Sequence, residues 1–86
     1  MPLLFAPDAF EDNIPRHEIE RIKKKVDWLW VNRTLVKHEP LRWDFTGYFK
    51  RRFGNYRIIY SYDKASDDMV IHLVGLRDSI YQDIHH

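Results

Sequence analysis

The hydrophobic repeat of this sequence changes once along the chain, and that change restricts the fold. From Arg16 to Arg33 the apolar residues recur with the 3.6-residue period of an amphipathic helix. From Phe45 onwards they alternate with the period of two that is typical of a half-buried strand. A chain of 86 residues has room for one domain with one core. We therefore expect residues 1–86 to form a single α+β domain, in which the helix packs on one face of a small antiparallel sheet.

Turn signals between the apolar runs give the expected order of elements. The predicted strands are Leu3–Ala6, Phe45–Phe53, Tyr56–Asp63 and Met69–Val74, with Gly54-Asn55 and Lys64–Asp68 as turns between the last three. These three consecutive strands predict an antiparallel meander. The remaining expectations are a helical turn over Ala9–Asp12 capped by Asp8, a connector over Thr34–Pro40, a strand break at Gly75, and a short helix or turn over Asp78–Asp83.

The helix has one apolar stripe, formed by Ile19, Ile22, Val26, Leu29 and Trp30. Pro15 precedes it, and acidic residues in its first turn agree with a helix start at this point. Trp28 falls nearly opposite the stripe. It is either an ordinary surface side chain or a docking point for a partner.

Positive charge is concentrated in one segment, although the formal net charge is only +1. Between Tyr48 and Tyr62 there are four basic residues and no acidic residue. If Phe49, Phe53, Ile58 and Tyr60 pack on the helix, the other face of these strands carries Lys50, Arg52 and Arg57. Neighbouring like charges on a sheet are destabilising, which favours an anion-binding face over a merely solvated one.

Several classes of site are excluded by composition. The chain has no cysteine, so disulfides, thiolate nucleophiles and cysteine-ligated zinc are ruled out. Its five histidines do not show metal-ligand spacing, and its three glycines do not form a phosphate-binding loop. No apolar run approaches the length of a membrane span or a signal peptide. We expect a cytoplasmic protein with no metal, small-molecule cofactor or membrane partner.

Two segments resemble a known family. Gly47–Tyr60, with its basic residues, Gly54-Asn55 and Tyr56-Arg57-Ile58-Ile59-Tyr60, is similar to the β-hairpin of RelE/ParE superfamily toxins. Val74–Tyr81 is similar to the last strand of those toxins, and the two segments follow in the family's order. The resemblance to the RelE-like branch implies a toxin of a type II toxin–antitoxin system. Such a toxin is a ribosome-dependent endoribonuclease that cleaves mRNA in the A site and is held in check by a cognate antitoxin.

Five residues match functional positions of that branch: Lys50, Arg52, Arg57, Arg77 and Tyr81. The resemblance implies that Arg57, Arg77 and Tyr81 are catalytic and that Lys50 and Arg52 bind RNA. The chain departs from the family pattern at Arg52, where lysine is usual, and at Leu76, where histidine or lysine is usual. Its N-terminal region is also short, with Pro15 where a long first helix would run.

The chemistry of metal-free RNA cleavage agrees with these residue types. Attack of a 2′-hydroxyl on the adjacent phosphate needs a base, an acid and cations around the charged transition state. Arginine forks match phosphate oxygens, and cations near Tyr81 would lower its pKa from the usual value of about 10, so that the phenol could act as the base.

Three further residues are predicted to contact RNA, each beside a plainer interpretation. Tyr48 either stacks on a base or packs in the protein. His72 is expected on the open side of the last strand with Val70 and Val74, near the cations, or is an ordinary half-exposed strand residue. His85 either takes part in proton transfer, as the resemblance implies for some relatives, or belongs with His86 to the remnant of a purification tag.

Two other functions remain open. A ParE-like toxin would inhibit DNA gyrase without cleaving RNA, and an inactive module would only bind its antitoxin. The cations and phenol at the family's positions favour the nuclease, whereas Leu76 and Arg52 keep the inactive module open. The expected partners of the leading hypothesis are a cognate antitoxin, the ribosome and mRNA.

Overall fold

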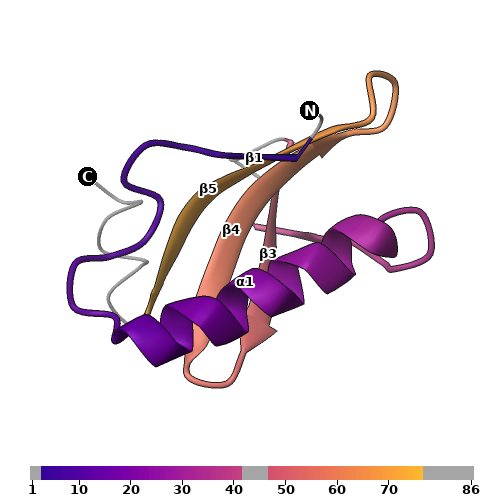
Figure 1. Cartoon of the computed structure of the whole chain (residues 1–86). Coiled ribbons are helices and arrows are strands. Elements are labelled where there is room, and N and C mark those ends of the chain that lie inside the picture. Colours follow the sequence, from indigo (N-terminus) through magenta and orange to yellow (C-terminus); the bar gives the residue numbers. More distant parts are fainter. Residues whose placement is uncertain (1–2, 42–46, 77–86) are drawn as a thin grey trace.

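The computed structural model describes residues 3–41 and 47–76 and shows one helix lying across one face of a five-stranded sheet (Figure 1). The sheet order is β1-β5-β4-β3-β2. The elements in chain order are β1 (Leu3–Phe5), α1 (Arg16–Val31), β2 (Glu39–Pro40), β3 (Tyr48–Phe53), β4 (Tyr56–Asp63) and β5 (Asp68–Leu76).

The sheet is mixed, so the prediction of a purely antiparallel sheet is only partly right. Strands β3, β4 and β5 form the expected antiparallel meander, and β2 adds to β3 in the antiparallel sense. Strand β1, however, pairs with β5 in parallel. A parallel pair requires a long connection, which α1 and the β3–β4 hairpin supply between the two strands. Part of the predicted connector Thr34–Pro40 also differs, because Glu39–Pro40 forms β2.

The predicted helix is confirmed as α1, and both of its ends have local causes. Pro15 precedes the first turn, where a missing N–H donor costs little, and Glu18 in that turn lies near the positive end of the helix dipole. At the other end, Asn32 donates from its side chain to the carbonyl oxygen of Trp28 at 2.9 Å. The same oxygen accepts from the backbone N–H of Asn32 at 3.0 Å, so both bonds close the last turn of the helix.

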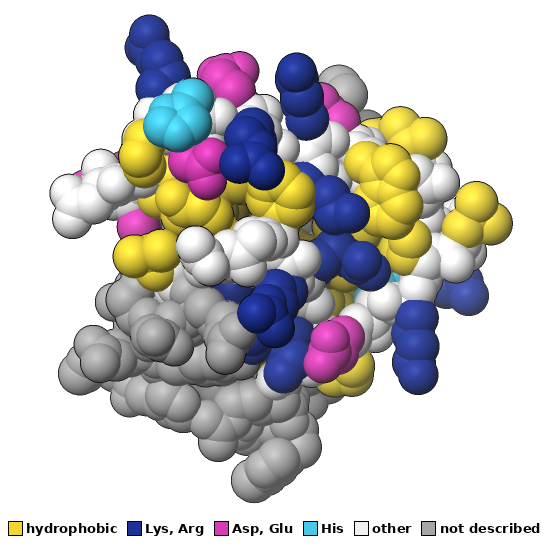
Figure 2. All heavy atoms as spheres, turned by 90° about the horizontal axis from the view of Figure 1, so that it is seen from below, with side chains coloured by type: hydrophobic (Ala, Val, Ile, Leu, Met, Phe, Trp, Pro, Cys, Tyr) yellow, Lys and Arg dark blue, Asp and Glu magenta, His cyan; other side chains and the backbone are white. Residues whose placement is uncertain are grey.

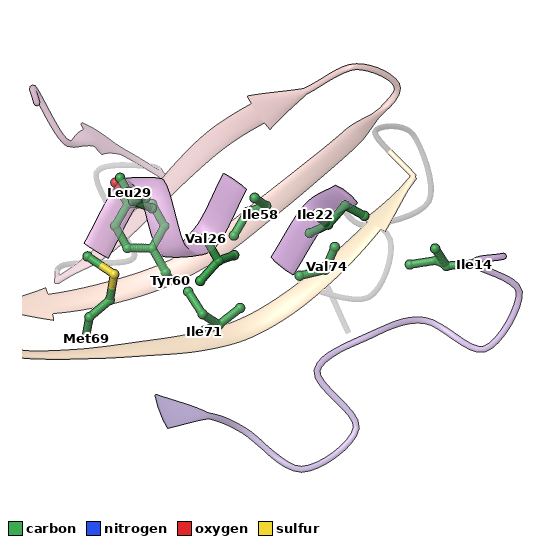
Figure 3. Close-up of a cluster of buried hydrophobic side chains, with 9 residues drawn as sticks. All are labelled: Ile14, Ile22, Val26, Leu29, Ile58, Tyr60, Met69, Ile71 and Val74. Carbon is green, nitrogen blue, oxygen red and sulfur yellow. The ribbon is translucent and has the colours of Figure 1, made fainter. Parts of the chain in front are cut away.

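The core lies between α1 and the sheet, as the two sequence periods predict. Figure 3 shows its buried side chains pointing toward one another from the helix, the strands and the segment before α1: Ile14, Ile22, Val26, Leu29, Ile58, Tyr60, Met69, Ile71 and Val74. Full burial of an aliphatic side chain contributes roughly 1.5–3 kcal/mol. Phe49, Phe53, Tyr56 and Tyr62 pack against this cluster from β3 and β4.

The predicted helical turn over Ala9–Asp12 is wrong, because this segment pairs with β5. The N–H of Val74 donates to the carbonyl oxygen of Ala9 at 2.7 Å, and the N–H of Glu11 donates to that of Val74 at 3.0 Å. Phe10 and Val74 form a parallel bridge. Asp8, with φ of 57°, turns the chain between β1 and this bridge. Pairing along the open edge of β5 satisfies backbone groups that a single helical turn would leave unpaired.

Gly75 does not end the last strand but lies inside β5, opposite Arg57. A Cβ atom at this position would overlap the side chain of Glu11, whose Cγ would lie only 2.8 Å away. Glycine is therefore present because another side chain approaches the backbone closely, and not because the strand breaks.

A β-bulge changes which side chains of β5 share a face. Ile59 is opposite Leu73 and Tyr60 is opposite Ile71, so His72 is the extra residue on β5. The bulge reverses the alternation beyond His72 and brings Val74 into the core with no exposed surface. The expectation that Val74 lies on the same side as His72 is therefore wrong.

Candidate nucleic-acid interface

The side chains of β3 and β4 that alternate with the core residues form the opposite surface of the sheet. This surface, called the basic face below, consists of Tyr48, Lys50, Arg52, Arg57, Ile59 and Ser61. The face predicted from the sequence to carry Lys50, Arg52 and Arg57 is thus confirmed. Seen from the end of the β3–β4 turn, Lys and Arg side chains gather across the middle of the molecule (Figure 2).

Two arginines are direct cross-strand partners on the basic face. Arg52 of β3 is opposite Arg57 of β4, two residues before and after the tight turn at Gly54-Asn55. Side chains of directly opposed residues lie roughly 4.5–5.5 Å apart at Cβ, and like charges at that spacing destabilise the pair. The hairpin therefore carries two arginines on directly opposed positions of one face, and guanidinium groups are suited to bind phosphate oxygens.

Lys50 has an acidic cross-strand partner. That partner is Glu39 of β2, and Lys50 Nζ lies 3.7 Å from Glu39 Oε1. Glu39 is 68% exposed, and such surface ion pairs contribute roughly 0–1 kcal/mol. A phosphate can displace this carboxylate at little cost. Glu39 was not predicted from the sequence, because it lies in the segment Thr34–Pro40, where a connector was expected.

Tyr48, Ser61 and His72 form a polar and aromatic group at the other end of the basic face. His72 Nε2 lies 2.8 Å from Ser61 Oγ, and the rings of Tyr48 and His72 meet edge to face with centroids 5.0 Å apart. Burial lowers the pKa of His72 below its usual value of 6.5. The imidazole is therefore neutral at neutral pH. Tyr48 and His72, which were both predicted to contact RNA, thus lie together. Tyr48 is four residues before Arg52 on β3.

The other predicted site residues, Arg77, Tyr81 and His85, lie outside the described residues, as does the predicted element Asp78–Asp83. Of the predicted catalytic residues, Arg57 alone lies within the part of the chain that the structure describes. Arg77 follows directly after Leu76, the last residue of β5.

A second polar cluster lies away from the basic face and joins the end of α1 to the β4–β5 turn. Arg33 donates to both carboxylate oxygens of Asp67, at 2.7 and 2.8 Å, and its guanidinium lies 3.7 Å from the centre of the Trp30 ring. Tyr62 donates to the same carboxylate at 2.7 Å. These bonds lower the pKa of Asp67 to about 2. The cluster stabilises the fold and was not evident from the sequence.

His38 extends this cluster into the core. Its Nε2 lies 2.8 Å from the carbonyl oxygen of Arg33, and its Nδ1 lies 2.6 Å from the hydroxyl of Tyr60. A carbonyl oxygen only accepts, so Nε2 carries a proton and donates to Arg33. Burial raises the pKa of Tyr60 above 10. The pair holds the segment between α1 and β2 against β4.

The Arg33–Asp67 pair predicts how stability depends on pH. The pKa of Asp67 falls from 3.8 to about 2 on folding, so the ionised carboxylate stabilises the fold above about pH 4. That contribution is lost as pH falls through 2. We expect Asp67→Asn to have a lower free energy of unfolding than wild type at about pH 6, with the difference shrinking toward pH 2. Urea unfolding at both pH values measures it, and a constant difference would contradict the prediction.

Trp28 is 44% exposed and lies between two cations. Lys25 Nζ is 4.0 Å from the centre of its ring, and the guanidinium carbon of Arg51 is 5.9 Å away. Since Arg51 belongs to β3, Trp28 borders the junction of α1 with the sheet and does not lie on a surface remote from it. Its role in docking a partner stays a prediction.

No helix within residues 3–41 and 47–76 is long and apolar enough to cross a membrane. In the same two ranges, no three His, Asp or Glu side chains come together as metal ligands.

Among known proteins, similarity to this chain is found in solved structures. No protein-family model matches the sequence, and no curated protein matches it. Among solved structures, the chain is similar to one in the RelB-RelE antitoxin-toxin complex from Methanococcus jannaschii, with 28% identity, a TM-score of 0.65 and coverage of 92% of this chain and 95% of that one. It also has the fold of a chain in the RelBE2 toxin-antitoxin complex from Mycobacterium tuberculosis, with 23% identity, a TM-score of 0.66 and coverage of 90% and 100%. Both similar chains come from complexes that pair a toxin with an antitoxin, and this chain shares their fold.

Proposed function

We propose that this chain is the toxin subunit of such a pair, of the RelE-like branch, and that it acts in the cytoplasm as a ribosome-dependent endoribonuclease. The observation that carries the proposal is the direct pairing of Arg52 with Arg57 on the basic face. A hairpin with two arginines on directly opposed positions is suited to a phosphate, and a nuclease must bind a phosphate at the point of cleavage.

The remaining parts of the basic face fit a single RNA strand. Successive residues on one face of a strand are spaced by roughly 6.6–6.8 Å, so Arg52, Lys50 and Tyr48 follow one line along β3. Arg52 and Lys50 are suited to successive phosphates, and the Tyr48 ring at the far end is suited to a base. An RNA strand running along the hairpin would therefore meet cations first and an aromatic side chain last.

The proposed reaction needs no metal and no small-molecule cofactor. The 2′-oxygen attacks the adjacent phosphorus, and the bond to the 5′-oxygen breaks, leaving a 2′,3′-cyclic phosphate and a 5′-hydroxyl. Arg57 and Arg77 stabilise the negative charge on the phosphorane oxygens, and Tyr81 takes part in proton transfer. Ribosome-bound mRNA in the A site is the proposed substrate, and the antitoxin is the proposed inhibitor.

The test is to map mRNA 5′ ends after adding the protein to a reconstituted translation reaction, with and without ribosomes. We expect new ends inside the A-site codon, only with ribosomes, and their loss in Arg77→Ala and Tyr81→Phe. Intact mRNA together with normal translation would contradict the nuclease. DNA supercoiling by gyrase would then be assayed, because the ParE-like alternative predicts its inhibition.

A further inference from the structure

The N-terminal segment places a carboxylate on the basic face, beside its arginines. Gly75 and Arg57 are direct partners of β5 and β4, so the missing Cβ of Gly75 would point to the same side of the sheet as the Arg57 side chain. The carboxyl group of Glu11 lies where that Cβ would be. Arg52, Arg57, Gly75 and the Glu11 carboxylate thus follow one another across neighbouring strands.

Glu11 is held in this position from several directions. Its backbone N–H donates to the carbonyl oxygen of Val74 at 3.0 Å, and its Oε1 accepts from the N–H of Leu76 at 3.0 Å. Its side-chain carbon atoms lie over Gly75. Glu39, the acid beside Lys50, is by contrast 68% exposed. An anchored group keeps a fixed position relative to a substrate, which proton transfer requires.

We propose that Glu11 accepts the proton of the attacking 2′-hydroxyl, an inference that rests on the proposed nuclease function. Ammonium and guanidinium groups keep their protons at neutral pH and cannot take another, whereas carboxylates are ionised. As the 2′-oxygen forms its bond to phosphorus, its proton passes to Glu11, and the P–O5′ bond breaks with its electron pair on the 5′-oxygen. The 5′-oxygen then takes a proton from water and leaves as the 5′-hydroxyl.

The test compares Glu11→Gln with Asp12→Asn, which neutralises the exposed acid next to it in the same segment. The amide that replaces the Glu11 carboxylate keeps an oxygen that can accept from the N–H of Leu76 but has no basicity. We expect the single-turnover rate of mRNA cleavage to fall about 100-fold or more in Glu11→Gln and to be unchanged in Asp12→Asn. Affinity for ribosomes whose mRNA carries a 2′-deoxynucleotide at the cut position should not fall in Glu11→Gln, because the substitution removes a negative charge.

A second substrate separates a proton acceptor from a proton donor. A 5′-thio leaving group needs no acid, so the defect of Glu11→Gln should persist on mRNA with sulfur in place of the 5′-oxygen. Recovery of the wild-type rate on this substrate would make Glu11 the donor and overturn the proposal. Wild-type cleavage of natural mRNA by Glu11→Gln would also overturn it, while leaving the nuclease function intact.

Gly75→Ala provides an independent variant with Glu11 itself unchanged. The added methyl group would occupy the position of the carboxylate and displace it from the basic face. We expect a loss of cleavage similar to that of Glu11→Gln, and no further loss in the double variant. Additive losses would contradict a shared cause. If the wild-type protein cleaves no mRNA with ribosomes, the nuclease function and the role of Glu11 fail together.

Discussion

Arg57→Ala is expected to lower the rate of RNA cleavage about 100- to 1000-fold, the usual effect of removing one donor that stabilises a developing anion. Arg57 lies at the turn end of the basic face, with Arg52 opposite on β3 and the Glu11 carboxylate over Gly75 on β5. RNA binding should weaken as well, and the dependence of log affinity on log salt concentration should become shallower by about 0.7.

The same substitution should change the free energy of unfolding far less than it changes the rate of cleavage. Removing Arg57 relieves the repulsion from Arg52, and directly opposed like charges on a sheet cost roughly 0.2–1 kcal/mol. This gain offsets contacts that the arginine side chain loses, so the net change in stability should stay small. If Arg57 had a merely structural role, its removal would change the free energy of unfolding more than the rate of cleavage. Cleavage assays, RNA titrations at several salt concentrations and urea unfolding measure the three quantities.

Lys24→Ala is the matched control for charge. Lys24 is exposed on α1, two residues from the buried Ile22 and therefore on the opposite side of the helix from the core. Its removal changes the net charge by the same amount as Arg57→Ala. We expect cleavage and the salt dependence to stay as in wild type. Equal losses in both variants would mean that total charge, and not the basic face, governs RNA binding.

Leu29→Ala is expected to lower the free energy of unfolding by about 2–5 kcal/mol. Leu29 has no exposed surface and lies in the core between α1 and the sheet. The substitution loses both the transfer free energy of the removed atoms and the contacts around the cavity. Small domains unfold with only roughly 5–15 kcal/mol, so this variant should unfold at much lower urea concentration.

Leu35→Ala makes the same chemical change at a side chain that is 82% exposed. Its effect on the free energy of unfolding should stay within about 0.5 kcal/mol. Urea unfolding followed by circular dichroism at one pH compares the two variants. A small effect at Leu29 would contradict the packing of α1 on the sheet, and a large effect at Leu35 would mean that its exposed position is wrong.

The parts of the fold that were correctly predicted depend on short-range patterns. The helix follows from apolar residues three and four positions apart, and the β3–β4 hairpin follows from alternation on either side of Gly54-Asn55. The same alternation predicts the basic face, since residues two apart on a strand share a side. Candidate residues on β3 and β4 could therefore be identified without coordinates.

The parts that were missed depend on residues far apart in the sequence. Arg33 and Asp67 are separated by 34 positions, and Glu11 and Leu76 by 65. Charge pattern and hydrophobic period describe residues that are close in the sequence. They do not predict which distant residues come into contact, because that depends on how the whole chain folds. Gly75 shows the consequence: a glycine near the end of a strand resembles a strand break, although it makes space for Glu11.

The sequence by itself determined the class of fold, the helix, the β3–β4 hairpin and the location of the arginines, because these follow from side-chain period and turn residues. Only the tertiary structure decided that β1 lies parallel to β5, that the bulge at His72 brings Val74 into the core, and that Glu11 reaches the basic face. Each of these depends on how the open edge of β5 is paired and where its register shifts. Edge pairing and register are set by the packing of distant segments, which local sequence patterns do not encode.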